Sequence, residues 1–234
     1  MNLNEALRQI AQDGRLNSDE LIAFAAEDAV GGRDTGAFDS MSTFADEGRV
    51  LYALIRAMRP YRVLEVGVAS GGTSTHILRA LAANGSGTLW SIDIEPGSGY
   101  QIPEDLKGDW TFVAADALIA DLPDADFVFE DGSHELLFTT TMLERLKALN
   151  PRIIVSHDYY THETYGGFHV KEAFDAVLPE GLGVKVDGAF TGLGVWFNRE
   201  WEAPIKPKPT DTSYGVIAAP AKKVPAKRKA VRRG

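Results

Sequence analysis

The chain has 234 residues, a formal net charge of -9 and no cysteine, which excludes a disulfide framework and thiolate chemistry. No apolar run approaches the ~20 residues that a membrane-spanning helix needs, and the polar, amphipathic first residues lack the pattern of a secretion signal. We therefore expect a cytoplasmic protein that binds no membrane. Its 44% hydrophobic content is enough for one well-buried α/β domain with some chain left over.

Residues 1–60 are helical in pattern. Apolar side chains recur at helical spacing within residues 3–12, 18–30 and 43–60, and Ser18 is expected to be an N-cap. We expect this segment to form either a lid over a ligand crevice or a surface through which the protein forms a homo-oligomer.

Residues 61–200 alternate between short apolar runs and helical patterns. Strands are predicted at 62–67, 87–94, 110–116, 125–131, 152–158, 182–188 and 192–198, and helices at 73–85, 134–149 and 169–178. Continuous apolar strands with helices between them indicate a Rossmann-like, doubly wound α/β sheet that is mainly parallel and carries helices on both faces. The last two strands are joined by a short turn, so we expect them to be antiparallel.

Residues 201–234 form a tail rich in proline, lysine and alanine. Seven basic side chains lie between Lys222 and Arg233, and no acidic residue follows Asp211. The tail has too few large apolar residues to fold alone, so we predict that it is disordered. The rest of the chain is strongly acidic, and we therefore expect no nucleic-acid binding except through the basic tail.

The stretch VLEVGVASGGTS, residues 63–74, has the pattern of a strand, a glycine turn and the start of a helix. Such a turn commonly holds a cofactor against its backbone, and a tight turn without a ligand is the alternative. A nucleoside triphosphate is disfavoured because Thr73 stands where a P-loop has lysine. A dinucleotide is disfavoured because Glu65, at the end of the strand, would lie near its pyrophosphate.

S-adenosylmethionine suits this turn better. The molecule has no phosphate, and its ammonium and sulfonium groups are cationic, so the carboxylate of Glu65 would attract it. The cofactor-binding residues expected in this turn are Glu65, Gly67, Ala69, Ser70, Gly71, Gly72 and Thr73.

Acidic residues also end the second and third strands. Asp93 lies 21 residues beyond Gly72, close to the ~20-residue offset of an acid that binds a ribose; Glu95 is its rival, and a solvated turn is the alternative. Asp116, which precedes Ala117, would accept a hydrogen bond from the adenine amino group or from a nearby backbone N–H. We expect Asp93, Asp116 and Ala117 to contact the cofactor, because ligands of open α/β sheets lie beyond the carboxyl ends of the strands.

The fourth and fifth strands each end with an aspartate and a histidine: Asp131 and His134, then His157 and Asp158. We interpret these four as candidate catalytic residues, because neighbouring strand ends face one crevice. Asp131 and Asp158 are candidate ligands of Mg²⁺, which prefers carboxylate oxygens, and a nearby histidine would take the proton of a substrate hydroxyl. The alternatives are helix capping by Glu130, Asp131 or Ser133 and a structural hydrogen bond of His157.

Together, LEVGVASGGTS, SIDIEP, DFVFEDGSHE and IIVSHDYYT resemble the bacterial class I methyltransferase group that contains macrolide-sugar O-methyltransferases and cephalosporin-hydroxylase-like proteins. The resemblance runs from Glu47 to Asn198. It implies a seven-stranded sheet with an antiparallel last strand, S-adenosylmethionine as cofactor and often Mg²⁺ bound by acids that match Asp131 and Asp158. The chain departs from the group at Ser133, where a second aspartate is common, and in the turn before the fifth strand.

We therefore expect methyl transfer from S-adenosylmethionine to a hydroxyl oxygen of a small-molecule acceptor. The alternatives are a nucleic-acid or protein methyltransferase tethered by the basic tail, and a non-catalytic or hydroxylase-like member of the same fold. We also expect the aromatic stretch at residues 159–169 to contribute to the acceptor site through Tyr159, Tyr160 and His162.

Overall fold

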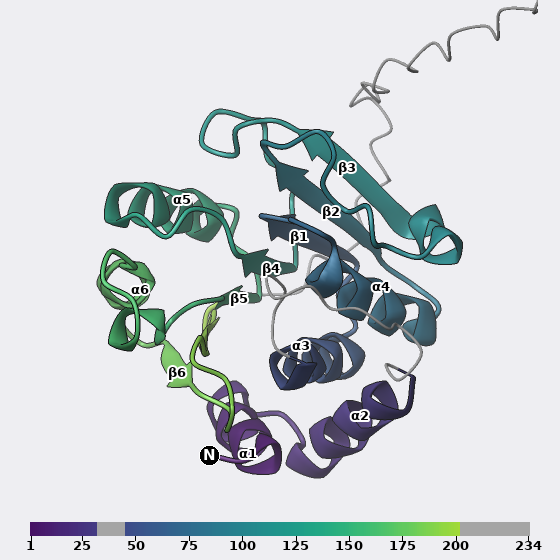
Figure 1. Cartoon of the computed structure of the whole chain (residues 1–234). Helices are drawn as coiled ribbons and strands as arrows, with labels where there is room; N and C mark the ends of the chain where they lie inside the picture. The colour runs from purple at the N-terminus through teal and green to yellow at the C-terminus, as the bar shows by residue number, and fades with distance from the viewer. Residues whose placement is uncertain (32–44, 202–234) are drawn as a thin grey trace, which may run out of the picture.

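The computed structural model describes residues 1–31 and 45–201, so the predicted disorder of the basic tail lies outside the described residues. The described residues form one seven-stranded sheet in the order β3-β2-β1-β4-β5-β7-β6 (Figure 1). The strands are β1 (Arg62–Val66), β2 (Thr88–Asp93), β3 (Trp110–Ala114), β4 (Phe127–Glu130), β5 (Ile153–Ser156), β6 (Leu182–Val184) and β7 (Leu193–Phe197). The α-helices are α1 (Leu3–Gly14), α2 (Ser18–Gly31), α3 (Ala45–Met58), α4 (Gly72–Asn84), α5 (Leu136–Ala148) and α6 (Val170–Val177), and the 3₁₀ turns are η2 (Glu104–Asp109) and η3 (Thr161–Glu163).

The predicted Rossmann-like α/β fold is confirmed. Strands β1 to β5 pair in parallel, whereas β7 pairs antiparallel with both β5 and β6. The short connection between the last two strands allowed only this direction, because a parallel pair needs a long crossover.

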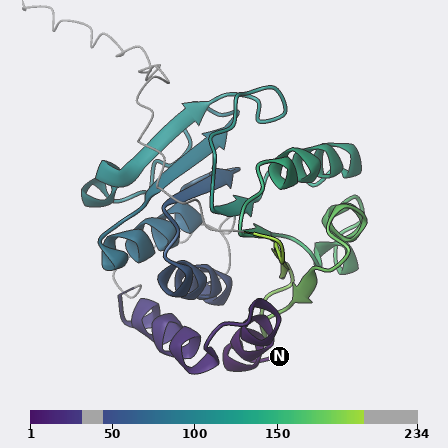
Figure 2. The ribbon, with the colours of Figure 1, turned by 180° about the vertical axis from the view of Figure 1, so that it is seen from behind.

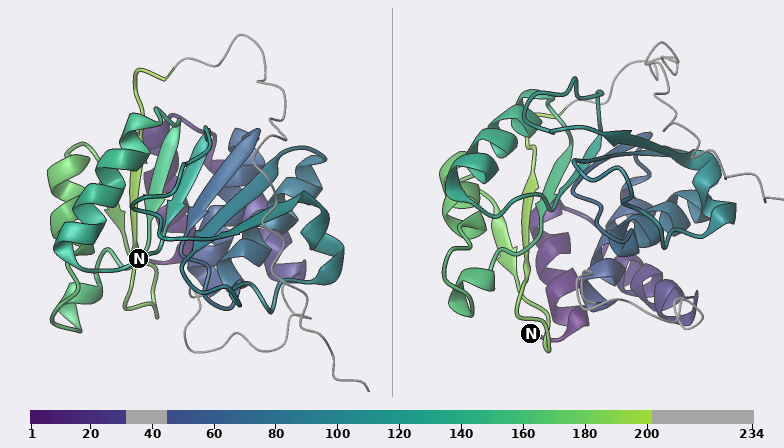
Figure 3. Two further views of the ribbon diagram at one scale, coloured as in Figure 1. Left: turned by 90° about the horizontal axis from the view of Figure 1, so that it is seen from above. Right: turned by 45° about the horizontal axis from the view of Figure 1, so that its top comes forward.

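Side chains alternate between the two faces of the sheet, so most strands contribute to two cores. On one face, Val63, Phe127 and Ile153 pack with helices α1 to α4. On the other face, Leu64 and Val128 pack with α5 and α6. Figure 2 shows these layers from behind, and the right panel of Figure 3 shows the sheet between them. The continuous apolar character of the strands follows from this double burial.

The N-terminal helices share a core with the sheet. Leu7 of α1, Leu21 of α2 and Leu51 of α3 are completely buried in the same cluster as side chains of β1 and β4. Helix α3 therefore lies against the sheet rather than apart from it, and it brings one acidic side chain to the site described below. None of the described helices is both long and apolar enough to cross a membrane.

The N-cap of α2 differs from the expected one. The side-chain oxygen of Asn17 accepts hydrogen bonds from the N–H groups of Asp19 (3.0 Å) and Glu20 (3.3 Å). Ser18 is already the first helical residue, so its expected role as N-cap is wrong. Asn and Ser are similarly favoured at this position, and the sequence alone did not separate the two neighbours.

Parallel pairing brings the ends of four strands to one edge of the sheet. Val66 of β1 pairs with Ile92 of β2 and with Glu130 of β4, and Glu130 pairs with Ser156 of β5. The residues that follow these positions leave the sheet side by side at its carboxyl edge. This is the edge at which open α/β sheets bind their ligands.

Candidate active site

The turn between β1 and α4 is shaped by positive backbone angles. Gly67 has φ +84°, and a Cβ built on it would lie 1.9 Å from the carbonyl oxygen of Asp131. Gly71, the N-cap residue of α4, has φ 94°. Ala69 is also left-handed, with φ 45°, in a region that glycine tolerates best. The turn thus keeps a glycine-type backbone although its middle glycine is replaced by alanine.

A cavity of about 440 Å³ lies beside this turn, at the carboxyl ends of the first four strands. Its wall includes five of the expected cofactor-binding residues: Gly67, Ala69, Asp93, Asp116 and Ala117. Ile94, Leu118 and Phe138 add apolar walls, and none of these three was among the expected cofactor-binding residues. The volume falls within the range of small-molecule sites in proteins.

The other expected residues of the turn do not line this cavity. They are Glu65, Ser70, Gly71, Gly72 and Thr73. The turn is held from behind, where the carbonyl oxygen of Ser70 accepts a hydrogen bond from the N–H of Gln101 (2.9 Å). Cofactor contacts by these five residues stay predictions.

Glu65 is completely buried beneath the turn. Its Oε2 accepts hydrogen bonds from the hydroxyls of Ser74 (2.8 Å) and Ser91 (2.5 Å), whereas Oε1 has no hydrogen-bond partner among the described residues. Burial raises the pKa of Glu65 to about 7, although the two serine hydroxyls act in the opposite direction. Oε1 is thus an acceptor without a partner, but Glu65 does not line the cavity, so its contact with a cationic ligand stays a prediction.

We expect Glu65→Gln to change how stability depends on pH. The pKa of Glu65 is about 7 in the folded chain and ~4.3 in an unfolded one, so folding favours the protonated form. Stability from this group is complete below the unfolded pKa and is lost as pH rises through the folded pKa. Glutamine does not titrate, so the variant should not lose this contribution as pH rises. The contribution amounts to about 3 kcal/mol in the free energy of unfolding.

Urea unfolding from about pH 4 to pH 8 measures this effect. Glu95→Gln, at an exposed position, is the matched control and should follow the wild-type curve. Equal pH slopes in wild type and Glu65→Gln would contradict the expectation.

Asp93 and Asp116 line the cavity and also hold backbone groups. Oδ2 of Asp93 accepts hydrogen bonds from two N–H groups of the glycine turn (2.8 and 3.0 Å), so it ties β2 to that turn. Oδ1 of Asp116 accepts from the N–H of Leu118 (2.9 Å), which was one of the two partners expected for it. Contacts with a ribose or an adenine stay predictions. Glu95, the rival of Asp93, does not line the cavity.

Arg145 of α5 fixes the loop that follows β3. Its guanidinium donates hydrogen bonds to the carbonyl oxygens of Ala117 and Ala120, the latter at 2.7 Å. Because Ala117 belongs to the cavity wall, Arg145 supports that wall from outside. No sequence pattern linked a helix residue to this loop.

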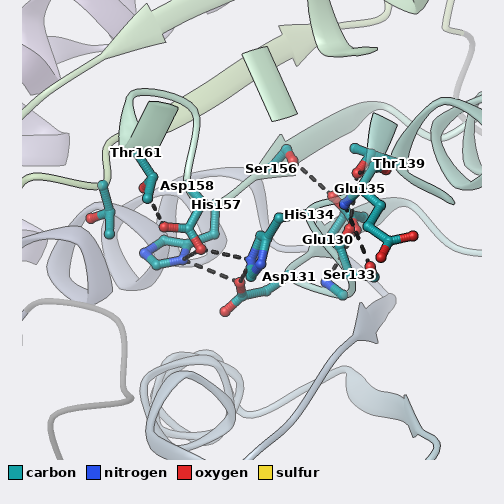
Figure 4. A network of polar contacts seen from close by, with 12 residues as sticks. Glu130, Asp131, Ser133, His134, Glu135, Thr139, Ser156, His157, Asp158 and Thr161 are labelled. Carbon is teal, nitrogen blue, oxygen red and sulfur yellow. Dashed lines mark hydrogen bonds and ion pairs between the residues drawn. The ribbon is translucent and has the colours of Figure 1, made fainter. Parts of the chain in front are cut away.

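The four candidate catalytic residues come together at the ends of β4 and β5 (Figure 4). Nε2 of His134 lies 2.7 Å from Oδ2 of Asp158 and 3.8 Å from Oδ1 of Asp131. Nδ1 of His157 lies 3.1 Å from Oδ1 of Asp131 and 3.3 Å from Oδ2 of Asp158. Asp131 also lines the cavity, so the Asp/His cluster adjoins it.

Three members of this cluster are arranged as potential metal ligands. One ligand atom each from Asp131, His134 and Asp158 lies within 4.8 Å of the others. The two expected Mg²⁺ ligands are therefore neighbours, and His134 is a further donor beside them. Mg²⁺ prefers oxygen and would use the carboxylates, whereas an imidazole ligand also suits Zn²⁺. Metal binding itself stays a prediction.

Electrostatics keep the cluster charged. Burial alone would lower the pKa of His134, but the neighbouring carboxylates of Asp131 and Asp158 outweigh it and raise that pKa to about 9. The pKa of His157 is likewise raised well above its ordinary value against the effect of burial, chiefly by the charge of Asp131. Burial would raise the pKa of Asp158, but the two histidines hold it well below its usual range. Each histidine thus favours its protonated form, and Asp158 favours its ionised form.

Glu47, in the first turn of α3, is a site residue that no motif marked. It is completely buried, and its Oε2 lies 3.1 Å from Nε2 of His157. Its carboxylate also accepts hydrogen bonds from the N–H of Gly192 (2.6 Å) and the hydroxyl of Thr191 (2.8 Å). Both ring nitrogens of His157 face carboxylates, and its side chain is 7% exposed. This position suits holding the cluster together better than exchanging a proton with a substrate.

The helix-capping alternative for the residues after β4 is wrong. Helix α5 begins at Leu136, and its N-cap residue is Glu135 rather than Glu130, Asp131 or Ser133. Asp131 therefore keeps its carboxylate for the histidines.

The aromatic stretch expected at the acceptor site divides between core and surface. Tyr159 is 4% exposed, belongs to the core beside α5 and α6, and donates its hydroxyl to Asp175 (2.6 Å). His162 is exposed, with Nδ1 3.2 Å from the carbonyl oxygen of Tyr159. Tyr159 therefore serves the fold, and acceptor contacts by Tyr160 and His162 stay predictions.

Residues 64–159 match a family described as a methyltransferase domain. No curated protein matches the chain in sequence. Among solved structures, a putative O-methyltransferase from Klebsiella pneumoniae is 17% identical with a TM-score of 0.52, over 76% of this chain and 89% of that one.

Two further solved structures carry SAH, S-adenosylhomocysteine. A methyltransferase from Podospora anserina is 13% identical with a TM-score of 0.51, over 82% of this chain and 94% of that one. An O-methyltransferase from Bacillus cereus is 14% identical with a TM-score of 0.50, over 77% and 91%. At these identities the likeness establishes the fold.

Proposed function

The chain carries a class I S-adenosylmethionine-dependent methyltransferase domain, and we propose that it transfers the methyl group to a hydroxyl oxygen of a small molecule. The observation that carries this proposal is the position of Asp131. This residue belongs both to the wall of the cavity beside the glycine turn and to the Asp/His cluster. A cofactor in the cavity and a hydroxyl at the cluster would therefore meet beside it.

The cavity residues suit S-adenosylmethionine. Asp93 and Asp116 offer carboxylates to the ribose and to the adenine amino group, and Phe138 offers an apolar surface for the adenine ring. The absence of a side chain at Gly67 lets the turn approach the backbone of Asp131 at the end of β4, and both residues line the cavity. SAH in the Podospora and Bacillus structures supports the same cofactor here.

For methyl transfer, the chain needs to orient the hydroxyl toward the methyl group and to remove the hydroxyl proton. S-adenosylmethionine supplies a methyl group on a cationic sulfur; a C–O bond forms as the C–S bond breaks, and S-adenosylhomocysteine leaves. His134 takes the hydroxyl proton at Nδ1, since its Nε2 faces Asp158 at 2.7 Å. Asp158 stabilises the imidazolium that results. His157, enclosed by carboxylates, holds Asp131 and Asp158 in place.

Asp131 and Asp158 would hold Mg²⁺, which would orient the hydroxyl and lower its pKa. We expect the identity of the metal to matter, because His134 is both a potential base and a potential ligand. Mg²⁺ prefers oxygen ligands, so His134 would stay available as the base. Zn²⁺ would also accept the imidazole of His134 as a ligand, and the base would then be lost.

A small-molecule acceptor agrees with the charge of the protein better than a nucleic acid does. Outside the basic tail the chain is strongly acidic, which repels phosphates. The tail lies outside the described residues. Nucleic-acid affinity measured over a range of salt concentrations, with the full chain and with a chain that lacks the tail, distinguishes a nucleic-acid acceptor from a small-molecule acceptor.

His134→Ala is expected to keep cofactor binding and to lose methyl transfer. Calorimetry with S-adenosylmethionine and S-adenosylhomocysteine should give the same affinity in wild type and variant, because His134 does not line the cavity. Transfer to a panel of hydroxyl compounds should fall by ~10²–10⁴-fold. In wild type, measured with chelator, the rate should rise with pH toward about 9, the pKa of His134, because the base must first lose its proton.

Glu135→Ala, at the exposed neighbouring residue, is the matched control. A folded wild type that binds no S-adenosylmethionine would refute the proposed methyl transfer. An unchanged rate in His134→Ala would refute only the assignment of the base.

A further inference from the structure

Three aromatic side chains form a series of ring contacts that begins at the Asp/His cluster. The ring of Phe168 stacks on that of His134, with centroids 4.5 Å apart and planes at 26°. Tyr165 lies 6.3 Å from Phe168, and Phe190 lies 5.5 Å from Tyr165. We call Phe168, Tyr165 and Phe190 the aromatic wall. Tyr165 is 51% and Phe190 is 38% exposed, so the wall faces solvent while one end touches a candidate catalytic residue.

The backbone of the aromatic wall is tied to the cluster. Phe168 precedes His169, whose N–H donates to the carbonyl oxygen of His134 (2.9 Å). Phe190 precedes Thr191, whose hydroxyl donates to Glu47 (2.8 Å). The two loops that carry the wall are thus fixed to the residues that build the site, and the wall keeps its place relative to His134.

The charged side chains around the aromatic wall are already paired. Glu163 accepts from Lys185 at 2.7 Å, and Asp187 pairs with the amino group of Met1 at 3.0 Å. On the α6 side, Lys171, Glu172 and Asp175 line a pocket together with Phe168. These side chains are paired as well, Lys171 with Asp175 and Glu172 with His169 at 3.2 Å. The wall therefore offers exposed ring surface with paired charges around it, which favours an uncharged ligand over an anion or a cation.

We infer that the aromatic wall binds the ring of an uncharged aromatic alcohol, whose hydroxyl then reaches His134 and Asp158. This inference rests on the proposed O-methyl transfer and names its acceptor class. Flat rings stack on exposed aromatic faces and remove apolar surface from water. A phenol also loses its proton near pH ~10, so it demands less of a base than an aliphatic alcohol does. A sugar would instead need several polar partners.

Binding should be measured on the full chain saturated with S-adenosylhomocysteine, in which no turnover occurs. The probes are a neutral phenol, the same ring bearing a carboxylate, and a sugar of similar size. We expect the neutral phenol to bind at least tenfold more tightly than the other two. Tyr165→Ala and Phe190→Ala should each weaken phenol binding by about tenfold, which corresponds to ~1.4 kcal/mol, without changing the affinity for S-adenosylhomocysteine.

Tyr61→Ala is the matched control, since Tyr61 is 43% exposed but precedes β1 at the opposite edge of the sheet. It should leave phenol binding unchanged. Preferential binding of the sugar or of the carboxylate, or phenol affinity that survives both wall variants, would overturn the aromatic acceptor while leaving methyl transfer intact. Failure of S-adenosylhomocysteine to bind would instead overturn the proposed function.

Discussion

Gly67→Ala is expected to abolish binding of S-adenosylmethionine, with a loss of at least ~100-fold in affinity. The added Cβ would lie 1.9 Å from the carbonyl oxygen of Asp131, an atom of the backbone that cannot rotate away. The residue also sits at φ +84°, where alanine is strained. Relief requires the turn to move away from β4, and this movement would distort the cavity wall on both sides. Overpacking of this kind also costs about 1–3 kcal/mol in the free energy of unfolding.

Ala69→Gly is the matched control for this variant. Ala69 is exposed and has φ 45°, so glycine relieves strain there without removing a packed side chain. We expect its stability to stay within about 1 kcal/mol of wild type and cofactor binding to be retained. Cofactor affinity is measured by calorimetry and stability by thermal unfolding for both variants. The comparison shows whether binding depends on the close approach at Gly67 or only on the number of glycines in the turn. Wild-type affinity in Gly67→Ala would mean that the cofactor does not depend on this close approach.

The fold and much of the site could be predicted because their signals are local. An apolar run that ends in glycine or aspartate marks the carboxyl end of a strand, and parallel strands deliver these ends to one edge. Asp131 and Asp158 were expected to be neighbours on this ground alone, and their carboxylates meet the same ring nitrogen of His157 at 3.1 and 3.3 Å. Topology, rather than any contact, produced that prediction.

The burial of Glu65 and its hydrogen-bond partners could not be predicted from the sequence. Its place at the end of β1 suggested an open cavity, but alternation along the strand puts its side chain on the face of Val63. That face is covered by α4, and the partners of Glu65 are Ser74 of α4 and Ser91 of β2. Because hydroxyls are common in helices and strands alike, no spacing distinguishes these two serines from others.

The sequence could have identified Glu47 as an unusual buried acid, but it could not have identified the residue with which Glu47 pairs. It precedes Leu51 and Leu54 by four and seven residues on the buried face of α3, and an acid on an apolar helix face requires a polar partner. That partner, His157, lies 110 residues later. Only the packing of α3 against the sheet brings the two together, so the pairing depends on tertiary structure.

Glu47→Gln is expected to lower methyl transfer by ~10–100-fold while the protein stays folded and keeps its affinity for S-adenosylmethionine. The amide oxygen can still accept from Gly192 or Thr191, but the negative charge opposite Nε2 of His157 is gone. The pKa of His157 should fall, because Glu47 is one of the groups that raise it. A weaker hold on His157 lets Asp131 and Asp158 move from the positions that the reaction needs, so kcat should fall more than KM rises.

Glu47→Ala would leave buried donors of His157, Thr191 and Gly192 without an acceptor, and removing one partner of a buried ion pair costs about 3–5 kcal/mol. Its inactivity could follow from unfolding alone, which is why Glu47→Gln carries the test. Asp46→Asn is the control in the same helix turn, since Asp46 pairs with Arg49 at 2.7 Å near the surface. NMR titration of the His157 ring gives a readout that a loss of packing would not mimic. If Glu47→Gln leaves both that titration and kcat at wild-type values, Glu47 anchors α3 and takes no part in positioning the cluster.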